Sequence, residues 1–92
     1  MNNAIISYLG ENKPNLITDI TTLLTDLGGE FSGVTFATLG RGCELTMVYS
    51  RDDGLDIKKI KKDLEAIETC KNGEFNVKLF EFNTESGPTT KI

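Results

Sequence analysis

A strand pattern gives way to a helix pattern in the stretch Gly10-Glu11-Asn12-Lys13-Pro14-Asn15-Leu16. The residues just before it, 4–9, are mostly apolar, β-branched or aromatic, and they end at a glycine, which predicts a buried strand. The residues after it place apolar side chains on one face of a helix, at Leu16, Ile20, Leu23, Leu24 and Leu27. The polar stretch is therefore predicted to be the loop that joins a strand to a helix.

This loop is a candidate site for a small zwitterion. Pro14 suits the entry to a helix, and Asn12 and Asn15 supply amide donors and acceptors. The backbone N–H groups of a first helical turn have no intrahelical partner and favour negative charge, so the carboxylate of a free amino acid would fit. The plainer alternative is that Asn12 or Asn15 caps the helix while Glu11 and Lys13 are solvated.

The other elements follow from glycine positions and from apolar spacing. The first helix ends at Gly28-Gly29, and Asp56 is the expected cap of a second helix. The remaining predicted elements are a strand over 30–39, a hairpin turn over 40–42, a strand over 43–50, a helix over 56–68 and a strand over 74–82. This βαββαβ order predicts an α+β, ferredoxin-like sandwich, with a four-stranded antiparallel sheet and two helices on one face.

The chain is expected to form one domain over residues 1–82. Residues 83–92 are rich in Thr, Ser, Gly and Pro and have no core pattern, which predicts a flexible C-terminal tail. The outer strands carry apolar residues on both faces, with Val34 and Phe36 alternating against Phe31, Ala37 and Leu39. Since one sheet face has no helix over it, we expect a homodimer or a larger oligomer, formed by sheet extension or by face packing.

Charge and composition exclude several functions. Ten basic and fourteen acidic residues give a net charge of −4, the opposite of what direct nucleic-acid binding requires. The sequence has neither a targeting signal nor an apolar run of about 20 residues, so we expect a cytoplasmic protein with no membrane contact. The two cysteines, Cys43 and Cys70, fall on different elements and there is no histidine, so we expect reduced structural thiols and neither a metal nor a cofactor.

The same residues argue against an enzyme and against other proteins of this topology. No nucleophile stands beside a base, and no spaced carboxylate pair falls in one pocket. The third strand of an RNA-recognition domain carries stacking aromatics, whereas residues 43–47 contain none. The first loop lacks the paired cysteines of a metal chaperone and the arginine of an acylphosphatase.

The lysines at 58, 59, 61 and 62 of the second predicted helix allow two interpretations. They could dock an acidic protein partner, in which case the association would weaken with salt. Alternatively, they form a solvated face on which Lys61 and Lys62 pair with Glu65.

The chain resembles the ACT domain, a small regulatory module that senses amino acids, over about residues 3–82. The segments that carry the resemblance are Tyr8-Leu9-Gly10, Glu11-Asn12-Lys13-Pro14 followed by Leu16-Ile17, the exit Leu27-Gly28-Gly29, and the strands that flank Gly40-Arg41-Gly42. The layout is most similar to stand-alone ACT proteins related to the glycine cleavage system transcriptional repressor. The resemblance implies a non-catalytic regulatory module that senses a small amino acid or a related metabolite and regulates amino-acid metabolism or its transcription.

In ACT domains that bind an amino acid, the ligand lies at a dimer interface, between this loop and the start of the second strand of a neighbouring subunit. Asn12 matches the loop asparagine that contacts serine in phosphoglycerate dehydrogenase. Three positions differ from the pattern: Gly10 replaces a histidine, Glu30 replaces an asparagine and could accept a ligand ammonium, and Asn15 replaces a glycine. The implied ligand site comprises Gly10, Glu11, Asn12, Lys13, Pro14, Asn15, Leu16 and, from the neighbour, Glu30.

The loss of the glycine at Asn15 favours a second interpretation of the same fold. In that interpretation the chain is a protein–protein interaction module without a ligand, which dimerises or docks on a regulatory protein.

Overall fold

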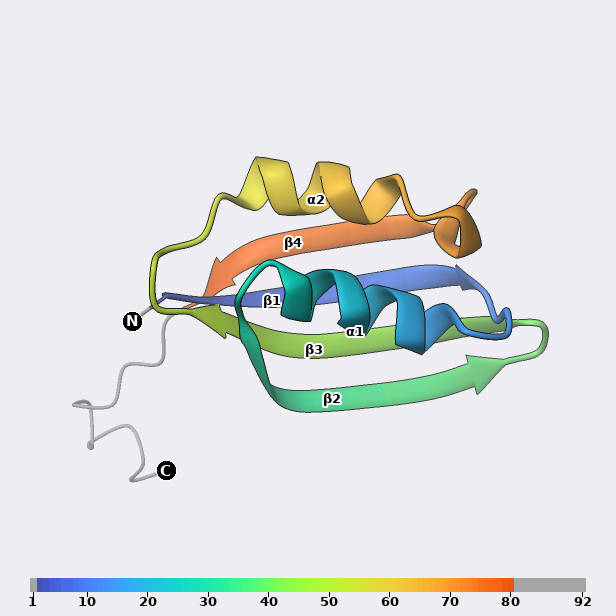
Figure 1. Ribbon diagram of the computed structural model, residues 1–92. Coiled ribbons are helices and arrows are strands. Elements are labelled where there is room, and N and C mark those ends of the chain that lie inside the picture. The colour runs from blue at the N-terminus through green and yellow to red at the C-terminus, as the bar shows by residue number, and fades with distance from the viewer. Residues whose placement is uncertain (1, 81–92) are drawn as a thin grey trace, which may run out of the picture.

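The strands and α-helices follow one another along the chain in the predicted βαββαβ order (Figure 1). The structure, a computed structural model, describes residues 2–80, so the expected tail at 83–92 and the last two residues of the strand expected over 74–82 lie outside the described residues. The elements are β1 (Asn2–Glu11), α1 (Leu16–Asp26), β2 (Glu30–Leu39), β3 (Gly42–Arg51), α2 (Ile57–Glu65), the short 3₁₀-helix η1 (Glu68–Cys70) and β4 (Glu74–Phe80).

The strands form one sheet in the order β2-β3-β1-β4, and every neighbouring pair is antiparallel. Both α-helices lie on the same face of this sheet (Figure 1). The predicted ferredoxin-like sandwich is therefore confirmed.

The hydrophobic core lies between the sheet and the helices. The strands contribute alternate residues to it, as the apolar alternation predicts, and each α-helix contributes one stripe. Its fully buried members include Ala4, Ile6 and Tyr8 of β1, Cys43, Leu45, Met47 and Tyr49 of β3, Leu16, Ile20 and Leu24 of α1, and Ile60 and Leu64 of α2.

The second helix is shorter than predicted. Asp56 caps it as expected, accepting a hydrogen bond from the Lys59 amide at 3.2 Å, but α2 ends at Glu65 rather than at residue 68. Ile67 takes an extended backbone (φ −71°, ψ 127°) and still packs on the core, after which the chain enters η1. The predicted ion pairs to Glu65 are wrong, because the structure instead pairs Lys59 with Asp63 at 2.8 Å.

The face assigned to Phe31 from the sequence is also wrong. A register shift between Phe31 and Gly33 leaves one extra residue in β2, and such a bulge reverses the alternation that follows it. Phe31 is therefore opposite Tyr49 on the core face of the sheet, together with Val34 and Phe36, rather than with Ala37 and Leu39.

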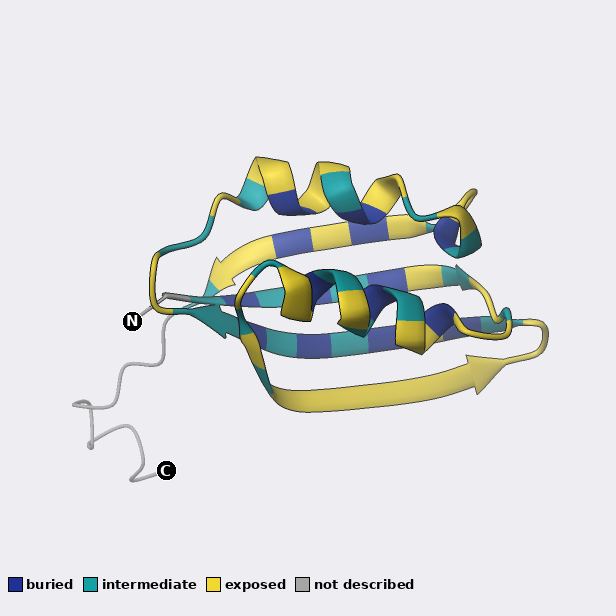
Figure 2. Cartoon of the chain, viewed as in Figure 1, coloured by how far each residue is buried: buried dark blue, intermediate teal, exposed yellow. Residues whose placement is uncertain are grey.

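Strand β2 is an edge strand with little cover. Figure 2 shows it exposed along almost its whole length, because α1 lies over β1 and β3. The side chains of Val34, Phe36 and Leu39 are 48%, 41% and 62% exposed, and residues 31–40 contain no charged residue. An uncharged apolar edge strand of this length favours pairing with another strand.

Candidate functional site

The loop between β1 and α1 is held at both ends. Where β1 ends, the Asn12 amide donates a hydrogen bond to the Arg41 carbonyl oxygen at 2.8 Å, which ties the loop to the β2–β3 turn. Where α1 begins, Leu16 is buried and its amide donates to the Lys13 carbonyl oxygen at 3.2 Å. Between these anchors Asn12, Pro14 and Asn15 are exposed and Lys13 is half-buried, so the polar groups of the loop face solvent.

Asn15 is the N-cap residue of α1 in position only. Its backbone is left-handed (φ 68°, ψ 7°), and its side chain makes no capping hydrogen bond, so the capping alternative is wrong for Asn15. Asparagine tolerates this conformation better than other residues with a side chain. This tolerance explains how asparagine stands where the ACT pattern has a glycine.

The N-terminus of α1 is open. Among residues 2–80 the amides of Ile17 and Thr18 find no acceptor, whereas the Asp19 amide donates to the Asn15 carbonyl oxygen at 2.9 Å. The Asp19 carboxylate accepts a hydrogen bond from the Thr69 hydroxyl of η1 at 2.7 Å. Free amides at a helix N-terminus bind carboxylates and other anions, and Lys13 lies in the loop that leads into this helix.

Glu30 lies far from this loop within one chain. Glu30 pairs with Ser50 and Ser50 with Asn3, whereas the loop begins at Gly10, so seven strand residues, or about 23 Å, separate the two. The structure therefore does not bring Glu30 to the other predicted site residues of the same chain. Glu30 lines a small hollow of about 180 Å³ with Gly28, Ser50, Arg51 and Asp52.

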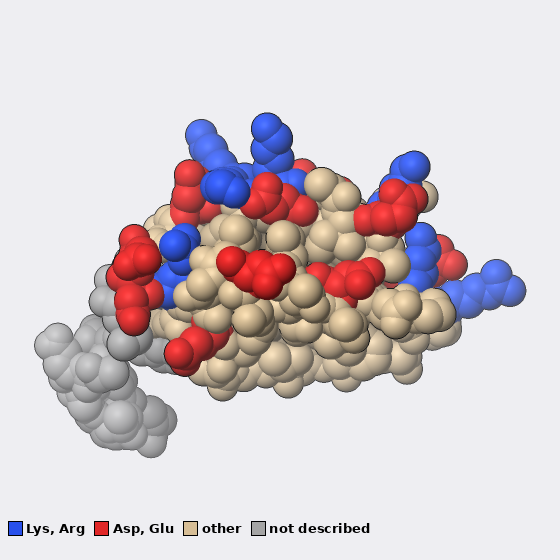
Figure 3. Space-filling model, viewed as in Figure 1, with Lys and Arg blue, Asp and Glu red and all other residues tan. Residues whose placement is uncertain are grey.

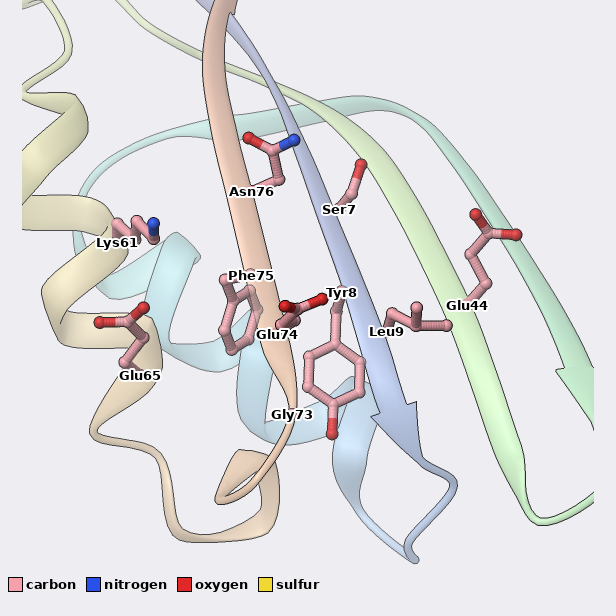
Figure 4. A pocket seen from close by; sticks show the side chains of 10 residues that line it. All are labelled: Ser7, Tyr8, Leu9, Glu44, Lys61, Glu65, Gly73, Glu74, Phe75 and Asn76. Atoms are coloured by element: carbon pink, nitrogen blue, oxygen red, sulfur yellow. The ribbon is translucent and has the colours of Figure 1, made fainter.

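A larger groove, of about 610 Å³, wraps the first half of β4 and contains none of the predicted site residues (Figure 4). Lys61 and Glu65 of α2 reach it from one side, and Glu44 and Glu74 from the sheet. Tyr8 also lines the groove. Its hydroxyl is buried without a hydrogen-bond partner in the part of the chain that the structure describes, a feature that the apolar pattern did not single out.

The two thiols are buried and unreactive. Burial raises the pKa of Cys70 from its usual 9.0 to about 11, and it also raises the pKa of Cys43. Both thiols therefore stay protonated near neutral pH, which suits structural residues rather than nucleophiles.

The charged side chains divide the surface unevenly (Figure 3). Lysine side chains project over α2 with carboxylates among them, whereas the opposite edge, along β2, is almost free of charge. Over residues 2–80, no helix is long and apolar enough to cross a membrane, and no three His, Cys, Asp or Glu side chains gather as a metal site would require.

No protein-family model and no curated protein sequence matches the chain. Among solved structures, an ACT domain protein from Streptococcus pneumoniae superposes with a TM-score of 0.74 at 20% identity, over 85% of this chain and 89% of that one. A protein assigned as a glycine cleavage system transcriptional repressor gives a TM-score of 0.75 at 17% identity, over 89% of this chain but only 47% of the other.

The ligand-free regulatory subunit of aspartate kinase from Thermus thermophilus gives a TM-score of 0.65 at 14% identity, over 96% of this chain and 64% of that subunit. The chain thus spans the ACT domain protein almost completely, and about half of the repressor. Its fold is the ACT-domain fold that the sequence resemblance predicted.

Proposed function

We propose that the chain is a non-catalytic regulatory module of the cytoplasm that binds a small amino acid, or a related metabolite, at a dimer interface. The observation that carries this proposal is the open N-terminus of α1. Its free amides, together with Lys13, suit the ligand carboxylate, and the exposed side-chain amide of Asn12 adds a second polar contact.

The geometry of β2 explains how a neighbouring chain would complete the site. Leu39, at the end of β2, pairs with Gly42, which in turn pairs with Glu11, so β2 ends beside the loop. If two β2 edges pair antiparallel about a two-fold axis, the start of one β2 meets the end of the other. Glu30 of the partner subunit then approaches this loop and can accept the ligand ammonium.

The structural neighbours support the regulatory part of the proposal, because those named above are an ACT domain protein, a transcriptional repressor and a regulatory subunit. Bound and free forms would then signal to a metabolic enzyme or to a transcriptional regulator.

A thermal-shift screen of the twenty free amino acids, followed by calorimetry of each that stabilises the protein, tests the proposal. Ligand at one hundred times its dissociation constant should stabilise the folded state by about 2.7 kcal/mol. Asn12→Ala should weaken binding by about 1 to 3 kcal/mol, because the polar group of the ligand that Asn12 contacts would be buried without a hydrogen-bond partner. Asn76→Ala, an exposed asparagine of β4, is the matched control and should bind normally. A well-folded dimer that binds none of the amino acids at millimolar concentration would refute the sensor.

That outcome would favour the second candidate, a protein–protein interaction module without a ligand. The uncharged, exposed edge of β2 supports this candidate, since strand pairing alone would use it.

A further inference from the structure

The chain has two tyrosines, Tyr8 and Tyr49, and they occupy equivalent places in the two halves of the fold. Both are buried on the helix side of the sheet, at 1% and 0% exposure. Tyr49 packs against Phe31 with ring centroids 5.6 Å apart, and Tyr8 packs against Phe75 at 4.9 Å, with nearly the same tilt of 50° and 51°.

The residues that face these rings are also repeated. Gly-Glu-Phe occurs at 29–31 and again at 73–75, each time where a strand begins after a helical segment. A Cβ on Gly29 would overlap the Tyr49 ring, and a Cβ on Gly73 would overlap the Tyr8 ring. The two tyrosines therefore serve as internal controls for each other.

Their hydroxyl groups differ. The Tyr49 hydroxyl donates a hydrogen bond to the carbonyl oxygen of Leu24 in the last turn of α1. The Tyr8 hydroxyl is equally buried but has no partner in residues 2–80. Buried polar groups are almost always hydrogen-bonded, so an orphan of this kind marks a place where a ligand or a water can bind.

The cause of the difference lies in the second helical segment. Gly29 follows Leu24 by five residues, whereas Gly73 follows the corresponding Leu64 by nine. The longer connection contains η1, and the Leu64 carbonyl oxygen already accepts a hydrogen bond from the Ile67 amide at 3.1 Å. The carbonyl oxygen of Leu64, which corresponds to the Leu24 carbonyl bound by Tyr49, therefore already accepts a hydrogen bond from its own chain segment.

The orphan hydroxyl lies just beneath the start of the loop. A Cβ on Gly10, like one on Gly73, would overlap the hydroxyl, so the backbone of these two glycines packs directly against the oxygen, and Gly10 itself is half-buried. Burial is the largest cause that raises the pKa of Tyr8, followed by the Cys70 and Cys43 thiols and then by the Glu11 carboxylate at the end of β1. The hydroxyl and the open amides of α1 are thus unsatisfied donors at one end of the sheet.

We propose that Tyr8 determines specificity in the loop site by donating a hydrogen bond from its hydroxyl to the carboxylate of the bound amino acid. This inference rests on the proposed function. The Gly10 and Gly73 backbone covers the hydroxyl, and neither residue places a side chain over it. When the loop moves away at Gly10, the ligand carboxylate bridges the Tyr8 hydroxyl and the free amides at the start of α1. Ligands of the same size without a carboxylate lose both sets of donors.

The test uses the full chain labelled with [ζ-¹³C]tyrosine, which gives one signal for each of the two tyrosines. The probes are the twenty free amino acids and the amide of each one that binds. The Tyr8 signal should move at saturation while the Tyr49 signal stays, because the Cζ shift reports the hydrogen bond of the hydroxyl. Calorimetry should show that Tyr8→Phe weakens binding about 10-fold or more, the effect of a lost hydrogen bond to a charged group. Tyr49→Phe should stay within about twofold of the original affinity.

The outcomes separate this inference from the proposed function. If the unmodified chain binds an amino acid while the Tyr8 signal and the affinity of Tyr8→Phe are unchanged, the assignment of Tyr8 is wrong and the sensor stands. If the chain binds no amino acid, both are overturned. Melting curves of the free variants check the fold: Tyr8→Phe should melt at or above the original temperature, because it removes an unpaired group, whereas Tyr49→Phe should melt lower.

Discussion

Asn15 links a single backbone conformation to the candidate site. Its left-handed φ of 68° lets the chain turn from the exposed loop into α1 without a side-chain cap, which leaves the first amides of the helix free for a ligand. A residue with a larger or β-branched side chain would be strained there, so both the turn and the open helix end depend on what occupies this position.

Substitution of Asn15 tests this role. Asn15→Ala should lower the free energy of unfolding by about 1 kcal/mol, because alanine tolerates the left-handed conformation less well than asparagine does. Asn15→Gly should leave it unchanged or raise it, because glycine adopts the left-handed region without a clash. Urea denaturation measures both, and an alanine variant at least as stable as the glycine variant would contradict the assigned conformation.

Leu64 and Lys62 lie two residues apart on α2 and face opposite ways. Leu64 is 0% exposed, so Leu64→Ala should lower the free energy of unfolding by about 2 to 5 kcal/mol. Lys62 is exposed, so Lys62→Ala should change it by about 0.5 kcal/mol or less. Equal losses in chemical denaturation would show that the register of this helix is wrong.

At the level of single elements, apolar periodicity predicts the strands and helices well. The strand over 30–39 is confirmed with the same bounds, and α1 begins at Leu16 as predicted, because one residue pattern dominates each of these segments. The two incorrect predictions, the face of Phe31 and the end of α2, have local causes. Ser32 is an extra residue in a bulge, which no alternation reveals, and Ile67 continues the apolar spacing of α2 although its backbone is already extended.

Strand β2 is the element on which the proposed dimer depends. The double variant Val34→Lys and Phe36→Lys should convert the dimer to a monomer of about 10.1 kDa, because pairing about a two-fold axis would bring four ammonium groups close together. Light scattering measures the mass.

Leu79→Lys is the matched control for that variant. Leu79 is 64% exposed, but it lies on β4, the opposite edge of the sheet, so its substitution should leave the dimer intact. If Leu79→Lys dissociates the dimer and the β2 variant does not, the interface lies on the β4 edge of the sheet rather than on the β2 edge. A monomer for the original chain at high micromolar concentration would remove the interface altogether.

At the level of the whole molecule, the buried thiols predict how stability depends on pH. The pKa of Cys70 is about 11 in the folded state, against 9.0 for an ordinary thiol, so above pH 9 the unfolded chain releases this proton first. The contribution of this thiol to the free energy of unfolding is therefore fully present below about pH 9. It is lost as the pH rises towards 11, by about 1.4 kcal/mol per pH unit for one proton. Denaturation between pH 8 and about 11 checks the slope, which Cys70→Ala should reduce. A slope that is the same in both proteins would contradict the assignment.

The candidate site could be predicted only in part. The loop from Gly10 to Leu16 can be predicted from one continuous stretch of sequence, because a strand pattern, a turn and a helix pattern follow one another there. Glu30 could not be placed by sequence patterns, since its distance from the loop follows from the sheet register and its proposed role needs a second chain. The lack of a hydrogen-bond partner for the Tyr8 hydroxyl could not be predicted from the sequence either, although the sequence does show the repeated Gly-Glu-Phe at 29–31 and 73–75.

A mixed-dimer titration tests the central claim, that Asn12 of one chain and Glu30 of its partner hold one amino acid. Asn12→Ala and Glu30→Ala homodimers should each bind the amino acid weakly. After the two variants are unfolded and refolded together, half of the dimers are mixed, and each of these has one intact and one doubly altered site. Calorimetry should then recover the original affinity in about one site in four. Weak binding in the mixture, with no recovered fraction, would contradict a site shared between subunits.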